Sequence, residues 1–448
     1  MIDEFLYTVI LGLRPDLLST KGKALNANKT TDLDSKEYYL NRDLSMLEFN
    51  QRVFEMACDA NIPLLERLRF LCIYTTNMDE YFEVRVAIQK HRLAIGSLST
   101  AADGLTATDI LRQVRERVEQ LVEEQYRLLN EELLPALKDE GICILRRPDW
   151  NEAQSDWIRK FFKRELLPVL TPIGLDMAHP FPRILNKILN FIVALEGNDA
   201  FGREAEYAIV QAPRSLSRVI RLPNDIADSE HCYVFLSSII HAHVSDFFPG
   251  MKVKSCHQFR ISRNSELIVD EEEVEDLKQA VAGELLERRF SAPVRLEVSN
   301  KCPAELYDFL LHQFGLQETE LYRVDGPVNL YRLAAVYDGV DRSDLKFPPF
   351  EAGIPARLQA EDQDMFSIIQ EGDILLHHPY QSFNPVVPDS PIVDALIRAA
   401  RANKEVVAVI ELMARFNEED NIAMASRLSA AGVQVVYGVV GYKRMARC

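Results

Sequence analysis

The sequence has few cysteines, and none of them are arranged as a typical metal site or disulfide framework. Its 448 residues include seven cysteines, which are scattered, odd in number and without a C-x-x-C pair. This pattern is typical of reduced thiols and disfavours disulfides and structural zinc. We therefore expect a cytoplasmic protein.

Long apolar runs are also missing. No stretch approaches the roughly 20 apolar residues that a membrane-spanning helix needs. The apolar segment Phe5–Leu13 is shorter still, and acidic residues precede it, whereas a signal peptide begins with basic residues. We expect neither a transmembrane segment nor a signal peptide.

Basic residues are not in excess. The formal net charge of -17 argues against a protein that coats nucleic acid through a broad basic surface, although a local basic groove could still bind a polyanion. No nucleic-acid partner is expected. Hydrophobic residues at 47% and charged residues at 27% are typical of a folded globular protein.

The chain exceeds what one hydrophobic core usually organises, so several domains are expected. Composition and periodicity divide it into four parts. Residues 1–37 form an extension whose order the sequence leaves open, and 38–140 form a helical N-terminal domain. Residues 141–348 form an α+β domain, and 349–448 an α/β domain.

Capping signals and apolar spacing predict the N-terminal helices. Ser45 with Glu48 fits a capping box, and Thr106 with Asp109 fits another. After the second, apolar residues recur at helical spacing as far as Leu133.

The middle part mixes strand and helix signals. Phe191–Leu195, Tyr207–Gln211 and Val294–Val298 read as strands, and Glu272–Arg289 reads as a helix.

The last hundred residues predict a βαβ unit. A helix at Ile392–Ala402 precedes the β-branched run Val406–Ile410, a helix at Glu418–Ala431 ended by Gly432, and a second run Val433–Val440. Such runs predict a parallel sheet that is buried on both faces.

Several long stretches together resemble the bacterial polyphosphate kinase family. They are NRDLSMLEFNQRVFEMA (41–57), PLLERLRFLCIYTTNMDEYFEVRVA (63–87), LTPIGLDMAHPFP (170–182), FRISRN (259–264), RRFSAPVRLEV (288–298), DILLHHPYQSFNPVV (373–387) and VIELMARFNEEDNIAMASRLSAAGVQVVYGVVGYK (409–443). The resemblance extends from about Tyr38 to Lys443.

The resemblance implies a multidomain α and α/β protein with a helical N-terminal domain, an α+β head domain and an incomplete phospholipase-D-like α/β domain. It implies reversible transfer of the terminal phosphate of ATP to inorganic polyphosphate through a phosphohistidine in an H-x-K setting. It also implies Mg²⁺ as a cofactor and a homo-oligomer formed through the head domain. Cationic groups and metal ions suit this chemistry because they offset the charge on the phosphoryl oxygens.

Asn77 matches the family's asparagine that contacts ATP. From local sequence alone the structural alternative is stronger, because Asn77 with Glu80 also fits a helix cap and its partner. The resemblance reverses that preference, and both roles could coexist.

Arg415 matches a family arginine at the magnesium-phosphate site. It follows the predicted strand that ends at Ile410, where ligands of parallel sheets bind, and a guanidinium suits phosphate oxygens. The alternative is a surface arginine paired with Glu418 or Glu419.

Four histidines in close pairs are weak metal candidates. His377 and His378 are adjacent in an extended segment and point to opposite faces, so loop architecture is favoured. His241 and His243 lie two apart in a predicted helix, where their side chains diverge.

The sequence departs from the family in three places. Met445 stands where the family has its reactive histidine, and a thioether is not a useful phosphoryl acceptor. Between Val387 and Pro388 about two dozen family residues are missing, comparable to a strand with part of its crossover. The last phospholipase-D-like domain and half of the preceding one are also absent from the chain.

We therefore expect a polyphosphate kinase by descent whose chain is itself inactive. Loss of one base from codons for Lys-Thr-His-Gly-Lys-Met can reproduce residues 443–448, which is compatible with a frameshift; a locus without the normal continuation in another frame would contradict it. The alternative is a non-catalytic oligomerisation or regulatory fragment of such a kinase. A phospholipase-D-like hydrolase is disfavoured because no H-x-K motif is present.

Overall fold

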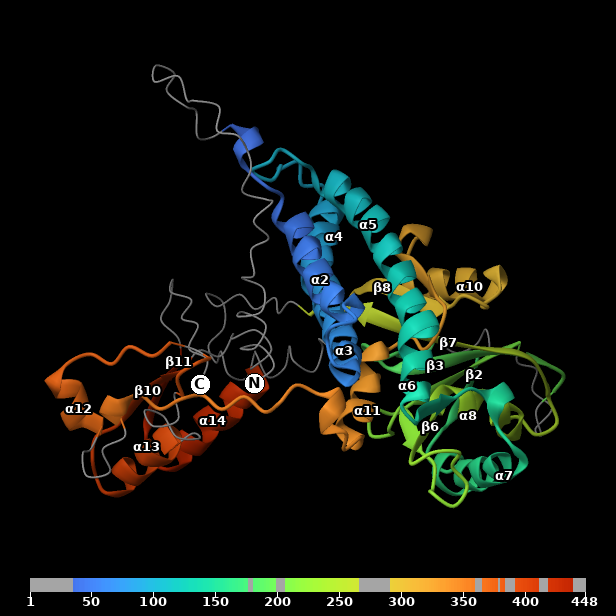
Figure 1. Ribbon diagram of the computed structural model, residues 1–448. Coiled ribbons are helices and arrows are strands. Elements are labelled where there is room, and N and C mark those ends of the chain that lie inside the picture. Colours follow the sequence, from blue (N-terminus) through green and yellow to red (C-terminus); the bar gives the residue numbers. More distant parts are fainter. Residues whose placement is uncertain are drawn as a thin grey trace. The chain divides into compact units, whose positions relative to one another are not determined.

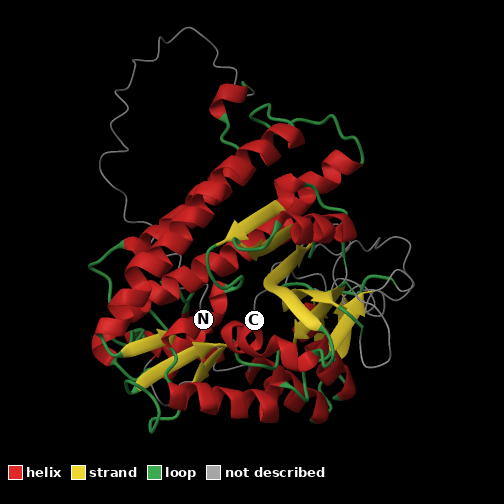
Figure 2. Cartoon of the chain, turned by 90° about the vertical axis from the view of Figure 1, so that its right-hand side faces the viewer, coloured by secondary structure: helices red, strands yellow, loops and turns green. Residues whose placement is uncertain are grey.

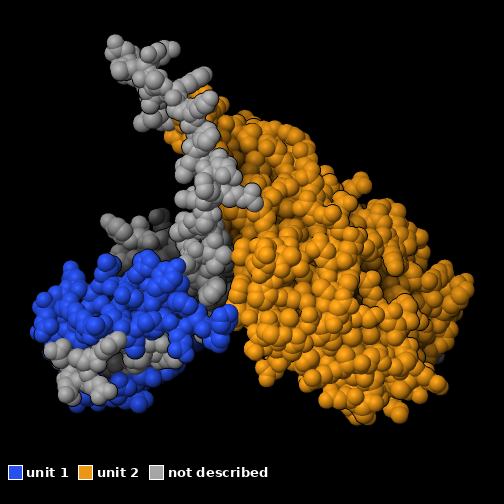
Figure 3. All heavy atoms as spheres, viewed as in Figure 1, with its two compact units in different colours: residues 1–31, 267–287, 348–448 blue, residues 32–266, 288–347 orange. Residues whose placement is uncertain are grey.

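The computed structural model describes residues 35–175, 180–198, 206–265, 291–358, 365–377, 379–382, 391–410 and 418–437. The chain divides into two compact units, which Figure 3 colours separately. Unit 1 comprises Met1–Thr31, Leu267–Glu287 and Pro348–Cys448, and unit 2 comprises Asp32–Glu266 and Arg288–Phe347. The helical and α+β parts expected on either side of residue 140 thus both lie in unit 2.

The helical part of unit 2 was predicted correctly. Its elements are α2 (Arg42–Cys58), α3 (Leu64–Tyr81), the π-helical η3 (Phe82–Val86), α4 (Ala87–Ala94), α5 (Ala107–Arg127), the π-helical η4 (Leu128–Leu133) and α6 (Leu134–Asp139), after the short 3₁₀ turn η2 (Lys36–Tyr38). Helix α2 packs against both α3 and α5 (Figure 1). Leu47, Leu68, Leu71 and Leu121 are buried, because the apolar residues of these helices recur on one face.

One predicted capping box is confirmed and the other is wrong. The Thr106 hydroxyl accepts from the Asp109 amide, and the Asp109 carboxylate accepts from the Thr106 amide, so α5 begins as expected. Helix α2 instead begins one turn before Ser45, because the Asn41 side chain accepts from the amides of residues 43 and 44. Ser45 and Glu48 lie on the exposed face inside α2.

These two sites make a matched prediction. We expect Thr106→Ala to lower the free energy of unfolding by about 1 kcal/mol, because it leaves an amide of the first turn without its acceptor. Ser45→Ala should change it by less than about 0.5 kcal/mol, because the residue is exposed and caps nothing. Urea denaturation of both variants would measure this, and a larger cost for Ser45→Ala would contradict the observed helix start.

A six-stranded sheet forms the centre of unit 2, with the order β2-β4-β3-β7-β8-β9. All neighbours are antiparallel except β8 and β9, which are parallel and joined through α10 (Ala304–Phe314). The three strands predicted in this region are confirmed as β3, β4 and β8. The strands are β2 (Pro172–Leu175), β3 (Leu189–Glu196), β4 (Tyr207–Ala212), β7 (Lys252–Arg263), β8 (Pro293–Ser299) and β9 (Leu321–Val324).

The two faces of this sheet differ in chemistry. Phe259 and Ile261 of β7 belong to an apolar cluster that includes Leu306 and Leu310 of α10. The residues that alternate with them, Arg260 among others, lie on the opposite face of the strand. That polar face is the one that meets α3, and it positions the candidate site.

A smaller sheet of order β1-β6-β5 completes unit 2. Figure 2 distinguishes the helices and the strands of the chain by colour. Strands β1 and β6 are parallel, and β5 and β6 are antiparallel. The strands of this sheet are β1 (Ile142–Leu145), β5 (Val219–Arg221) and β6 (His231–Phe235). The remaining described elements of unit 2 are η5 (Arg147–Asp149), α7 (Glu152–Phe161), η6 (Phe162–Leu166), α8 (Leu236–His243), η7 (Val244–Phe247), η9 (Glu318–Glu320), η10 (Leu330–Leu333), α11 (Ala334–Gly339) and η11 (Ser343–Leu345).

Unit 1 contains the predicted βαβ unit. Its elements are η12 (Ala356–Leu358), α12 (Met365–Glu371), α13 (Pro391–Arg401), β10 (Val407–Ile410), α14 (Glu418–Ala430) and β11 (Gln434–Tyr437). Strands β10 and β11 pair in parallel, as expected. The expectation that both faces of the sheet are buried is wrong: Val407, Val409 and Val436 are between 39% and 53% exposed. Among the described residues, α13 and α14 contribute to one apolar cluster with the alternate strand residues, so only that face is buried.

Some sequence predictions fall on residues that the structure does not describe. The helix at Glu272–Arg289 is one, and Arg415 and Met445 are two more. Among the described helices, none is both long and apolar enough to cross a bilayer.

Candidate functional site

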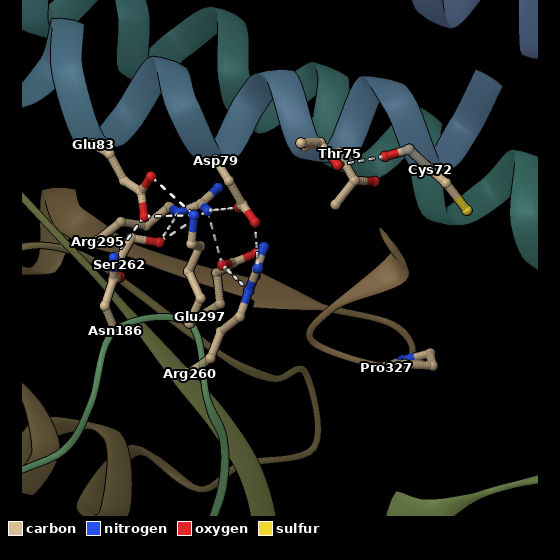
Figure 4. Close-up of polar contacts among 12 residues, drawn as sticks. Cys72, Thr75, Asp79, Glu83, Asn186, Arg260, Ser262, Arg295, Glu297 and Pro327 are labelled. Carbon is tan, nitrogen blue, oxygen red and sulfur yellow. Dashed lines mark hydrogen bonds and ion pairs between the residues drawn. The ribbon is translucent and has the colours of Figure 1, made fainter. Parts of the chain in front are cut away.

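A buried network of charged side chains joins α3 to the polar face of the large sheet (Figure 4). Asp79 of α3 lies between two arginines. Its Oδ2 accepts from Nη1 of Arg260 on β7 at 2.8 Å, and its Oδ1 accepts from Nη2 of Arg295 on β8 at 2.5 Å. One helical carboxylate therefore holds two neighbouring strands.

Glu297 completes the charge balance of the network. Its Oε1 accepts from Nη2 of Arg260 at 3.0 Å, and its Oε2 lies 2.5 Å from Arg260 Nε in a close ion contact without hydrogen-bond angles. Arg295 Nη2 lies 3.1 Å from Glu297 Oε2 and also donates to the Ser262 hydroxyl at 3.0 Å. Two guanidinium groups thus meet two carboxylates, which is the arrangement that buried charge requires.

The alternation of β7 and β8 produces this pairing. Arg260 lies directly opposite Glu297 in the strand register, and Ser262 lies directly opposite Arg295. Because side chains one residue apart point to opposite faces, the apolar residues between them enter the core with α10. Both arginines are at most 3% exposed.

The charges of the network stabilise one another. Burial alone would raise the pKa of Asp79, but the neighbouring Arg260 and Arg295 guanidinium groups hold it below its usual value. Burial alone would lower the pKa of Arg260, and the Asp79 and Glu297 carboxylates raise it. Asp79 and Arg260 therefore stay charged near neutral pH. Arg295 also stacks on the Phe82 ring, with its guanidinium carbon 4.2 Å from the ring centroid.

A second carboxylate anchors the turn that follows α3. Glu83 lies in the π-helical turn η3, and its side chain is 3% exposed. It accepts from Lys187 Nζ at 2.9 Å and from Asn186 Nδ2 at 2.6 Å, while its backbone carbonyl accepts from the Ser265 amide at 3.0 Å. Asn186 in turn accepts from the Arg263 amide.

Lys187 has a backbone φ of 56°, a conformation that a lysine adopts only when its surroundings hold it there. Its backbone amide donates to the Ile261 carbonyl, and its ammonium group pairs with Glu83. Both the backbone and the side chain of Lys187 therefore hold the loop before β3 in place.

Asn77 lies inside α3, near its end, and is half-buried. The cap interpretation is wrong, because α3 begins at Leu64, well before this residue. Two residues along a helix turn it by about 200°, so Asn77 and Asp79 occupy opposite faces. Asn77 makes no side-chain hydrogen bond to another described residue. The ion-pair network thus fixes the helix that carries Asn77. The side-chain amide of Asn77 keeps its hydrogen-bond donors and its acceptor unused by the described residues.

The histidines discounted from the sequence have local roles where the structure describes them. The His377 ring stacks on Tyr380 with centroids 5.2 Å apart, and His378 lies outside the described residues. His241 shares a hydrogen bond with Arg147, and His243 stacks on Phe162.

The described residues include no cluster of side chains that could hold a metal ion on its own. Among them there is no group of three or more histidine, cysteine, aspartate or glutamate side chains that could hold a metal ion. The carboxylates of Asp79, Glu83 and Glu297 are paired with arginine or lysine, so they are not available as Mg²⁺ ligands. Arg415, expected at the metal-phosphate site, lies outside the described residues, as does Met445.

The network lies in three of the segments that resemble the family, but no motif in them singles out its members. A signal was present: in FRISRN and PVRLEV, charged residues alternate with apolar ones in strands whose apolar side is expected to be buried. Charged side chains on the second face of a central strand require partners there.

Domain families of polyphosphate kinase match three segments of the chain. They are the N-terminal domain over residues 39–145, the middle domain over residues 153–336 and C-terminal domain 1 over residues 386–448. A curated polyphosphate kinase of Pseudomonas aeruginosa is 49% identical over 438 residues, covering 93% of this chain and 63% of that protein. One of Pseudomonas putida is 50% identical, covering 93% and 60%.

A solved structure is also similar. The crystal structure of polyphosphate kinase from Porphyromonas gingivalis matches with a TM-score of 0.71 and 26% identity, covering 90% of this chain and 59% of that one. The chain spans about three-fifths of the length of these proteins. Three matching domain families, and 49% sequence identity to a curated polyphosphate kinase over 93% of the chain, show that the chain belongs to the polyphosphate kinase family.

Proposed function

We propose that this chain takes part in the reversible transfer of the terminal phosphate of ATP to inorganic polyphosphate. In this proposal Asn77 binds ATP. The observation that carries this proposal is the position of Asn77 on a helix fixed by a buried ion-pair network. A side-chain amide offers two donors and one acceptor, and those of Asn77 are unused by the described protein groups. It therefore suits phosphate oxygens or the polar edge of a nucleotide base.

Calorimetric titration with a non-hydrolysable ATP analogue tests this proposal, with AMP as the matched control. We expect the analogue to bind with a Kd below about 1 mM, and AMP to bind at least tenfold more weakly because it lacks the β- and γ-phosphates. Equal binding of the two ligands would contradict a triphosphate site.

We further propose that this chain does not itself carry phosphate on a histidine. Met445 stands where the family has its reactive histidine, and its thioether cannot replace an imidazole nucleophile. Arg415 is proposed to bind phosphate oxygens at the family's Mg²⁺-phosphate site, because its guanidinium matches their geometry.

The expected result is that purified protein incubated with γ-labelled ATP shows no acid-labile label and makes no polyphosphate. A polyphosphate kinase that retains the histidine serves as the positive control in the same assay. Phosphohistidine at any of the nine histidines of this chain would contradict the proposal.

The resemblance also leads us to propose a homo-oligomer formed through the head domain, and a cytoplasmic location. The six cysteines that the structure describes are all free, which supports a reducing compartment. A monomeric mass by light scattering over the working concentration range would contradict the oligomer.

A further inference from the structure

A small cavity lies within unit 2, and no residue of α3 lines it. It is lined by residues of the small sheet, of β7 and of the segment around η10, and its volume is about 20 Å³. This volume is the space open to the centre of a water-sized sphere, so the cavity itself is larger. Ser237, Gln258 and Asn329 in its wall are partly buried.

Two arginines enter this cavity without acidic partners. Arg218 is 9% exposed, and its Nη2 donates to the Ala212 carbonyl at 2.8 Å, whereas its Nη1 has no partner. Arg332 lines the same cavity, and its Nε is also buried without a partner. Among the described residues that line the cavity, none is acidic. This differs from the network beneath α3, where each guanidinium meets carboxylates.

The two like charges act on each other. Burial, together with the smaller effect of the charge of Arg332, lowers the pKa of Arg218 to about 10. Arg218 nevertheless remains protonated near neutral pH. Two positive charges beside a partly desolvated cavity create a local potential that favours an anion.

Neutral polar groups around the cavity suit an oxyanion with several oxygens. The Oδ1 of Asn329 and the Oε1 of Gln258 are buried without partners, and Ser237 supplies a hydroxyl. An amide of Asn329 turned by 180° would present its NH₂ group, because the two orientations have nearly the same shape. A protonated phosphate oxygen could instead donate to these carbonyls as they stand.

We propose that this cavity binds one phosphate oxyanion, either free orthophosphate or the end group of a phosphate chain, with Arg218 and Arg332 as its ligands. Guanidinium groups pair with phosphate oxygens through short, charge-assisted hydrogen bonds, which supply the missing partners. A water molecule would satisfy the hydrogen bonds but leave both charges uncompensated. The site is separate from the proposed ATP residue Asn77, so it stands or falls independently of the proposed function.

Equilibrium dialysis of the full chain with labelled orthophosphate, at constant ionic strength set with chloride, tests the proposal. We expect one phosphate per chain with a Kd below about 1 mM, and at least tenfold weaker binding by Arg218→Gln and by Arg332→Gln. Arg332 is half-exposed, so its variant is expected to fold even where the Arg218 variant does not.

One variant serves as the control. Arg221→Gln removes an exposed arginine that lies three residues from Arg218, donates to the Glu230 carbonyl and does not line the cavity. It should bind orthophosphate as the unchanged chain does. Competition by short-chain polyphosphate would show that chain ends enter the site, and its absence would restrict the site to free phosphate. Failure of the unchanged chain to retain phosphate above the chloride background, or unaltered binding by Arg332→Gln, would overturn the proposal.

Discussion

Replacing Asp79 by alanine is expected to lower the free energy of unfolding of unit 2 by about 3–5 kcal/mol, because the change leaves two buried guanidinium groups with one carboxylate between them. Arg260 and Arg295 are at most 3% exposed, so water cannot take the place of the lost partner without opening the contact between α3 and the sheet. Urea denaturation followed by circular dichroism would measure this.

A matched control is available within the same unit. Arg67 pairs with Glu132, whose side chain is 58% exposed, and Arg67 also donates to the Ala57 carbonyl. We expect Glu132→Ala to cost less than about 1 kcal/mol, because an exposed ion pair is screened by solvent and its partner keeps other acceptors. If both variants cost the same, the buried network does not hold α3 in the way described.

The depressed pKa of Asp79 predicts the pH dependence of its contribution. A carboxylate whose folded pKa is lowered stabilises the fold above its unfolded pKa, which is near 3.8, and loses that contribution as the pH falls below this value. The difference in unfolding free energy between the unchanged chain and Asp79→Asn should therefore be constant near neutral pH and shrink below about pH 4. A difference that grows on acidification would show that Asp79 is protonated in the folded state.

Local patterns predicted the elements better than their boundaries. Thr106 and Asp109 were recognised because a capping box lies within four consecutive residues. Ser45 and Glu48 satisfied the same pattern inside a helix that another residue, Asn41, begins. The cap alternative for Asn77 fails for the same reason: a cap motif can occur by chance within a helix, and α3 begins at Leu64, after Pro63.

Pairing between distant segments could not be predicted from local patterns. Asp79 is separated by 181 residues from Arg260 and by 216 from Arg295. The alternation of β7 shows which residues share a face, but not which helix covers that face. Likewise, the β-branched runs at β10 and β11 predicted a sheet buried on both faces, whereas Val407 and Val409 show that one face is exposed within the described residues.

The family resemblance gave Asn77 its proposed role, and the structure explains how the residue is held. Asp79 lies two residues further along α3 and faces the sheet, so the network that fixes Asp79 also fixes the direction of Asn77. Thr76, next to Asn77, is exposed, and its hydroxyl donates to the Cys72 carbonyl of its own helix. It therefore offers a neighbouring substitution that leaves the amide in place.

The most direct test of this account is calorimetric titration of Asn77→Ala and Thr76→Ala with the non-hydrolysable ATP analogue. We expect Asn77→Ala to weaken binding at least tenfold, because about 1.4 kcal/mol is lost with the amide's hydrogen bonds to the nucleotide. Thr76→Ala should bind as the unchanged chain does, and both variants should unfold at similar urea concentrations. Binding by Asn77→Ala with unaltered affinity would contradict the central claim that α3 presents Asn77 to ATP.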